Sequence, residues 1–221
     1  MPALVCDDGP FTKEAGVSNL EKPLSRHLFP TAVFLACMVY AIFRYNVFGE
    51  VSPEQIPLFI FNKGASFAGV ILLGWSRCEA DPRRRRDWGM AGMNLILLHV
   101  IISLSLLTPA YFGKFFHSSG MMNWQAETSM LCGTLSFLLL CWLFVATLQE
   151  KKKAKAAAST SLLPGAGRTM LLLAGAHVAF MGYAGWLKPK TWHGYLPPIT
   201  LLSFVVVMIF ILSPRLSKKR R

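Results

Sequence analysis

Long runs of apolar residues alternate with short polar or basic segments along the chain. Six of the apolar runs can each cross a hydrocarbon core of about 30 Å, which takes roughly 20 helical residues. We expect transmembrane helices over residues 28–48, 57–76, 88–110, 127–148, 169–187 and 197–214. The pattern predicts an all-α fold, a polytopic membrane protein made of one six-helix bundle. A short segment, 1–27, precedes the bundle and a basic tail, 215–221, follows it.

Composition supports a membrane protein over a soluble one. The chain is 53% hydrophobic and only 15% charged, which departs from the usual balance of a soluble globular domain. We therefore expect the lipid bilayer to be its main surroundings, with the plasma (inner) membrane as the location.

The net charge of +12 would suit a nucleic-acid-binding protein, but the placement of the charges argues against that function. Eighteen of the 23 Lys and Arg residues lie in four alternating polar segments: 1–27, 76–88, 149–168 and 215–221. The positive-inside rule then predicts that both termini are cytoplasmic. Because anionic lipid headgroups account for such basic loops, we expect no nucleic-acid partner.

Two histidines lie inside the expected spans. His99, in NLILLHVIISL, is at the centre of the third span, and His177 is one position from the centre of the fifth. Both helices run in the same direction, so the two imidazoles should reach nearly the same depth, about 15 Å from either surface. An imidazole in hydrocarbon needs a polar partner. A metal would accept a lone pair from each ring, and haem iron with two axial histidines is the natural candidate.

A structural role for these histidines is the alternative. Each ring can instead form a hydrogen bond to a serine or a carbonyl group of a neighbouring helix. Small residues around His177, such as Ala174 and Gly185, allow either close helix packing or a flat ligand. Ser103, one turn after His99, can likewise bond a neighbouring helix or border a haem. Under this alternative the chain is a non-redox transporter or scaffold subunit.

Most of the chain, from about Arg44 to Pro214, resembles the ferric-reductase-like transmembrane family, which includes the membrane anchor of the bacterial methionine sulfoxide reductase system. Besides the six spans and two central histidines, the segments that carry the resemblance are FRYNVFGEV, LFIFNKGAS, HVIISLSLLTPAYFGKFF and GYLPPITLLSF. The resemblance implies that b-type haem is held between the third and fifth helices, with His99 and His177 as axial ligands. It also implies electron transport through the membrane, as the membrane component of an oxidoreductase.

The chain departs from that family in its number of histidines. Family members usually carry a second histidine about four turns further along each of the two helices, which holds a second haem. Here Phe112 and Gly113 follow His99 at that spacing, and Lys190 and Thr191 follow His177. We therefore expect one haem b. His117 and His193, in loops beyond the helices, are the candidate ligands of a second haem, or are simply solvated.

Two basic residues inside the expected spans are further candidates for the site. Lys63 and Arg44 can contact a haem propionate or a quinone. Arg44 can instead extend its charged end to the membrane surface, and Lys63 can pair with Glu127. The sequence has no GxGxxG motif and no soluble extension for flavin or nicotinamide. We expect the electron donor to be a quinone or a redox partner protein.

Overall fold

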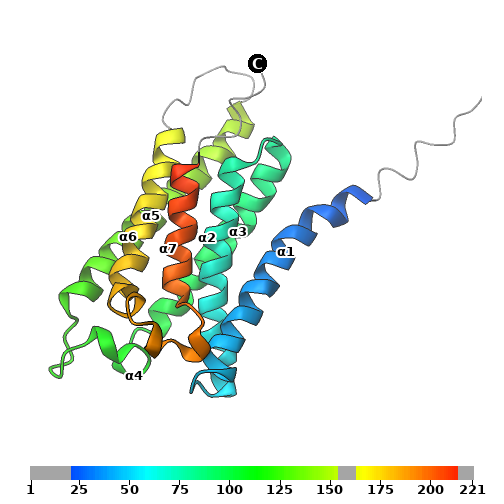
Figure 1. Ribbon diagram of the computed structural model, residues 1–221. Helices are drawn as coiled ribbons and strands as arrows, with labels where there is room; N and C mark the ends of the chain where they lie inside the picture. The colour runs from blue at the N-terminus through cyan, green and yellow to red at the C-terminus, as the bar shows by residue number, and fades with distance from the viewer. Residues whose placement is uncertain (1–20, 154–162, 214–221) are drawn as a thin grey trace, which may run out of the picture.

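The computed structural model describes residues 21–153 and 163–213, and this part of the chain is all-α (Figure 1). It includes one isolated bridge between Phe116 and Met122. The predicted tail 215–221 and most of the segment 1–27 lie outside the described residues. Six stretches are long and apolar enough to cross a membrane, so the prediction of an integral, multi-pass membrane protein is confirmed. The long helices are α1 (Glu21–Ile42), α2 (Phe61–Cys78), α3 (Pro82–Ser105), α5 (Trp124–Lys153), α6 (Leu163–Trp186) and α7 (Ile199–Leu212).

Several short helical turns gather at one end of the bundle, which we call the α4 end (Figure 1). The opposite end carries the start of α1 and the end of α7, so the described chain begins and ends on the same side. The short elements are η1 (Phe43–Val47), η2 (Pro53–Gln55), η3 (Ile56–Ile60), α4 (Pro109–Phe112), η4 (Gly113–Phe115), η5 (Pro189–Thr191) and η6 (His193–Tyr195).

The third span begins and ends earlier than predicted. It was expected over 88–110, whereas α3 runs from Pro82 to Ser105. At its start, the side chain of Asp81 accepts a hydrogen bond of 2.9 Å from the Arg83 backbone N–H, which caps the helix. At the other end, Pro109 explains why the helix ends at Ser105. The ring of a proline clashes with the carbonyl group four residues earlier, here that of Ser105, and a proline has no N–H group to donate a hydrogen bond to it.

The helices form two groups that α7 connects. α2 packs against α1, α3 and α7, while α5 packs against α6, and α6 also contacts α7. A close approach of α2 and α3 depends on two glycines, since a Cβ atom on Gly92 would lie 3.1 Å from the Gly69 carbonyl oxygen. Small residues of this kind let membrane helices pack closely.

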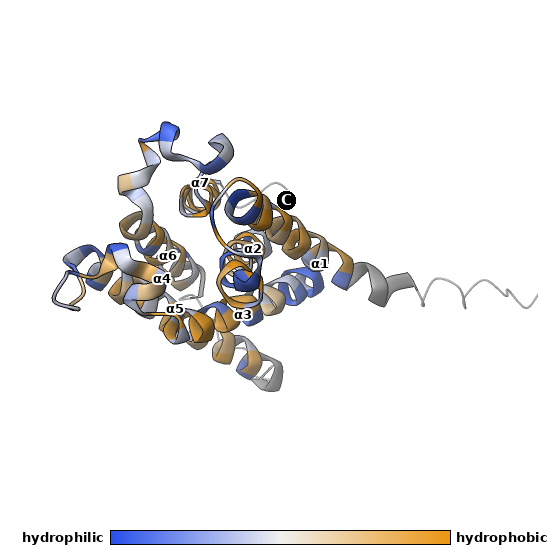
Figure 2. Ribbon diagram, turned by 90° about the horizontal axis from the view of Figure 1, so that it is seen from below, coloured by the Kyte–Doolittle hydropathy of each residue, from blue (hydrophilic) through white to orange (hydrophobic). Residues whose placement is uncertain are grey.

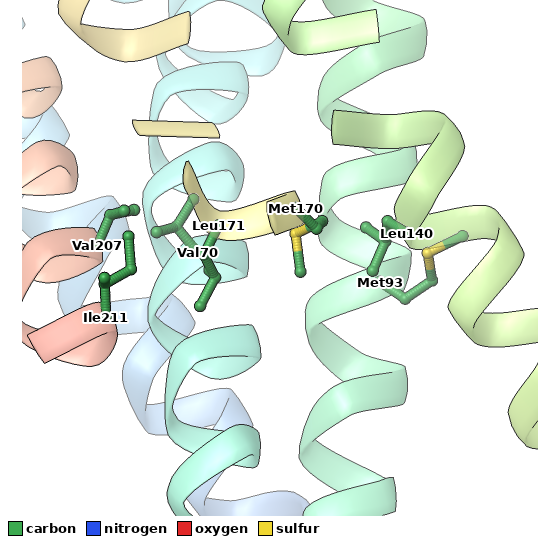
Figure 3. Packing of buried hydrophobic residues seen from close by; sticks show 7 residues of the cluster. All are labelled: Val70, Met93, Leu140, Met170, Leu171, Val207 and Ile211. Atoms are coloured by element: carbon green, nitrogen blue, oxygen red, sulfur yellow. The ribbon is translucent and has the colours of Figure 1, made fainter. Parts of the chain in front are cut away.

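An apolar cluster joins the two groups on the side of the bundle away from α4. It draws residues from all the long helices except α1, as Figure 3 shows: Val70, Met93, Leu140, Met170, Leu171, Val207 and Ile211. A second cluster, Leu106, Phe112, Phe115 and Ala126, lies at the α4 end. The space between these two clusters is where the candidate site lies.

Apolar residues predominate along the long helices (Figure 2). Large hydrophobic side chains are exposed along α3 and α5, among them Leu97, Ile101, Leu104, Leu131, Leu135, Leu138 and Val145. A soluble monomer rarely exposes contiguous apolar surface on this scale. These faces are therefore in contact with lipid.

Candidate functional site

A cavity of about 350 Å³ lies between the two helix groups and is lined mainly by apolar side chains. His99 reaches it from α3 and His177 from α6. Among the described helices, α3 packs on α2 and α6 packs on α5 and α7, whereas α3 and α6 form no comparable contact. The structure thus brings the two predicted histidines to a single cavity, on helices that are held apart.

His99 is held by a short polar chain between α2 and α3. Its Nδ1 lies 2.7 Å from the side-chain oxygen Oδ1 of Asn62, and Asn62 donates a hydrogen bond of 2.9 Å from Nδ2 to Ser103 Oγ. Asn62 is only 2% exposed, so its amide must find partners inside the protein. Ser103 Oγ also lies 3.3 Å from Nδ1 of His99. In the amide orientation of this structure, Nδ2 of Asn62 donates to Ser103 and Oδ1 of Asn62 accepts, so that Nδ1 of His99 carries the proton.

His177 is held in a similar way, by hydrogen bonds to α5. Its Nδ1 donates a hydrogen bond of 2.8 Å to the backbone carbonyl oxygen of Ser129. Ser129 Oγ in turn donates to the His177 carbonyl oxygen at 2.9 Å. The ring lies close to α5 because residue 133 is glycine: a Cβ atom there would be 2.8 Å from Nδ1 of His177.

Both imidazoles therefore keep the same nitrogen free. A carbonyl oxygen can only accept, so the proton of neutral His177 is on Nδ1 and Nε2 has an available lone pair. The Asn62 bond leaves His99 in the same tautomer. In the described part of the chain, no hydrogen bond involves Nε2 of either ring. Metal-binding histidines typically show this arrangement, with the second nitrogen donating to a fixed acceptor.

The set of available ligands fits a haem iron better than an ion bound by protein alone. Among the described residues no three or more His, Cys, Asp or Glu side chains are grouped to hold a metal ion, although protein-only sites use three or four ligands. A haem macrocycle supplies four nitrogens, so two histidines complete its iron. The cavity volume is also within the usual range for ligand sites, about 300–1,000 Å³.

The histidines lie nearer the α4 end than the sequence suggested. His99 is six residues before the end of α3, which is about 9 Å along the helix axis. His177 is nine residues before the end of α6, about 14 Å. For His99 the shift follows from the early end of α3, which moves the middle of that helix away from the histidine. His177 hardly moves relative to the end of its helix, because α6 ends at Trp186, one residue before the predicted end.

Lys63 and Arg44 both point inward. Lys63 lines the histidine cavity, with its Nζ atom 4.9 Å and 5.1 Å from the ring centres of Phe59 and Phe112. Within the described residues it forms no ion pair, with Glu127 or any other carboxylate. Arg44 is only 5% exposed and donates a hydrogen bond from Nη1 to the Leu196 carbonyl oxygen. Its guanidinium group is therefore buried within the protein.

A second cavity, of about 410 Å³, adjoins the first at the α4 end, and we call it the α4-end chamber. Arg44, Lys63 and Lys114 all line it, and Lys63, Phe112 and Phe115 line both cavities. Lys114 donates a hydrogen bond of 2.9 Å to the Met181 carbonyl oxygen. Desolvation lowers the pKa of the Lys114 ammonium below its ordinary value, because partial burial disfavours the charged form.

The two loop histidines lie away from both cavities. His117 and His193 are exposed, and neither lines the histidine cavity or the α4-end chamber. His193 packs near the ring of Tyr45, with ring centres 6.5 Å apart. The described structure therefore adds no support for a second haem between them.

Four residues of the site had no assigned role in the sequence interpretation. They are Asn62, Ser129, Gly133 and Lys114. Asn62 carries a recognisable signal, since an amide in an apolar helix needs a partner. Ser129 and Gly133 do not, because serine and glycine are common in membrane helices and only their neighbours reveal their roles. Ser103, in contrast, does bond a neighbouring helix, as one of its two proposed roles required.

No protein-family model and no curated protein sequence matches the chain. The resemblance to ferric-reductase-like proteins therefore stays a prediction.

Proposed function

We propose that the protein is a b-type haem membrane protein that carries electrons within the membrane. His99 and His177 would bind the haem iron through Nε2. The observation that supports this most strongly is that both rings border one apolar cavity, each with Nδ1 hydrogen-bonded to a fixed acceptor and Nε2 free.

The residues around the site would each contribute to holding the haem. Bound haem supplies a one-electron redox couple. Asn62 and Ser129 would orient the two imidazoles and keep them in the tautomer that binds a metal. The apolar cluster on the side of the cavity away from α4 would exclude water from that side. Low solvent access of this kind is one of the ways in which a protein adjusts a haem potential.

The position of the cavity indicates where electrons would enter and leave. Its histidines lie closer to the α4 end than to the other end, so a partner at the α4 end would have the shorter transfer distance. We propose a quinone or a redox partner protein as the second carrier. In this role the chain would be the electron-transfer component of an oxidoreductase in the plasma (inner) membrane.

The visible absorption spectrum of the purified protein tests the haem. With haem supplied during expression, we expect a Soret band and, after reduction, the sharp α-band of a low-spin b-type haem with two nitrogen ligands. A haem-to-protein ratio near one is expected from the single pair of histidines. A colourless protein under these conditions would refute the proposal.

A second candidate function rests on the same hydrogen bonds. Asn62 and Ser129 also tie neighbouring helices together through the histidines, as a non-redox transporter or scaffold subunit would require. That function predicts a colourless protein. It also leaves the two Nε2 atoms and the cavity between the helices without a role, which is why we favour the haem.

The placement of the basic loops predicts the orientation in the membrane. We propose that the α4 end faces outward and that both termini are cytoplasmic. A cysteine introduced at exposed Ser118, beyond η4, should then react with a membrane-impermeant maleimide in intact cells, while one at exposed Ala80, between α2 and α3, should react only after lysis. The reverse pattern would show that the orientation is wrong.

A further inference from the structure

The α4-end chamber gathers positive charge without any opposing carboxylate. Its basic side chains come from three separate elements: Arg44 from η1, Lys63 from α2 and Lys114 from η4. No Asp or Glu lines it, and none of the three is in an ion pair within the described residues. Arg44 is buried, Lys63 is half-buried and Lys114 is exposed. Like charges gathered around one cavity disfavour one another unless a counter-charge joins them.

Each of these side chains also keeps unused hydrogen-bond donors. Arg44 Nε is buried and has no partner in the described structure. The Lys63 ammonium lies over two aromatic rings, and the described residues offer it no hydrogen bond. Lys114 uses one of its three N–H groups on Met181. An anion with several oxygens would satisfy these donors together.

The connection between the two cavities narrows the choice of anion. Lys63 and Phe112 line both the apolar histidine cavity and the charged chamber. A ligand with an apolar body in the first cavity and anionic oxygens in the second would fit both. Carboxylates suit this arrangement because guanidinium and ammonium groups form short, charge-assisted hydrogen bonds with them.

We propose that the α4-end chamber is a carboxylate-binding site that adjoins the histidine cavity. The carboxylates come either from the two propionates of a bound haem or from a free organic anion that enters at the α4 end. The first source rests on the proposed function and would fix the haem with its propionates towards the α4 end. The second source does not depend on haem.

A comparison of haem with haem dimethyl ester tests the first source, the haem propionates, because the ester lacks their two negative charges. We would titrate each into haem-free protein and follow the quenching of tryptophan fluorescence, since Trp192 lines the chamber. Wild type should bind haem about tenfold more tightly than the ester, the size expected for losing one hydrogen bond between charged groups. In Lys63→Met and Lys114→Gln that preference should shrink several-fold. The preference for haem over the ester should stay unchanged in Lys188→Gln. Lys188 is exposed at the same end of the bundle and does not line the chamber.

Succinate tests the second source by calorimetric titration of the haem-free protein. Binding in wild type and Lys188→Gln, with loss in Lys114→Gln, would support a free carboxylate ligand. Lys63→Met should raise the melting temperature of the haem-free protein, because it removes a half-buried charge that has no ion pair in the described structure. The melting transition also shows that the variant folds.

The outcomes separate this inference from the proposed function. If haem fails to bind but succinate binds and depends on Lys114, the haem function falls and the chamber proposal stands. If haem binds, the ester is disfavoured equally in wild type and in both chamber variants, and succinate does not bind, the chamber is not a carboxylate site.

Discussion

Replacing either His99 or His177 by alanine is expected to abolish stable haem binding. Each ring is the only imidazole that its helix offers to the cavity, and within the described chain the two rings are not grouped with any other His, Cys, Asp or Glu side chain that could hold a metal ion. The Soret band per mole of protein should fall to background in both variants. The helical signal in circular dichroism should stay close to wild type, because the helices are held mainly by the apolar clusters.

His117→Ala is the matched control, since this exposed histidine lies outside both cavities. It should retain the wild-type spectrum and haem content. If the His99 and His177 variants kept full haem content as well, the assigned axial ligands would be wrong. If they lost helical structure instead, the histidines would be acting as structural hydrogen-bond donors, as the scaffold alternative holds.

Gly133→Ala is expected to weaken haem binding by about 10- to 100-fold without touching the iron directly. The new methyl group would lie 2.8 Å from Nδ1 of His177, so the ring would have to move away from α5. That movement breaks its hydrogen bond to the Ser129 carbonyl oxygen. Loss of such a supporting contact typically costs metal affinity by this factor. Titration of haem into haem-free protein would measure it.

Gly167→Ala on α6 provides the control for a glycine-to-alanine change in a helix. Nothing lies within 4 Å of a Cβ atom at Gly167, so this variant should bind haem like wild type and be slightly more stable, by about 0.5–1 kcal/mol. Equal haem affinity in the Gly133 and Gly167 variants would contradict the position of His177 against α5.

The six apolar runs were enough to predict the helices, but not where each one ends. Helix formation across a membrane depends on local composition and length, which are written directly in the chain. The end of α3 shows the limit of this approach. The apolar run continues to Ala110, yet helix α3 ends at Ser105, four residues before Pro109. The ring of a proline constrains the turn before it, so a hydropathy pattern alone places the boundary too late.

The candidate site could likewise be predicted from the sequence only in part. Two histidines within apolar helices are visible in the sequence as polar groups that need partners. Which partners they have is a matter of packing. Asn62 is 37 positions from His99 and Ser129 is 48 positions from His177, and no local pattern connects them. Their hydrogen bonds decide which nitrogen stays free, and so whether the rings can serve as ligands.

By itself the sequence determined the class of the fold, the membrane environment and the two histidines, because these follow from composition and helical length. Only the tertiary structure decided that α3 and α6 face each other across a cavity rather than in contact. It also decided that Arg44, Lys63 and Lys114 surround one chamber. These features depend on how distant helices pack, and side-chain packing between helices is set by shape and by pairing of polar groups that are far apart in the chain.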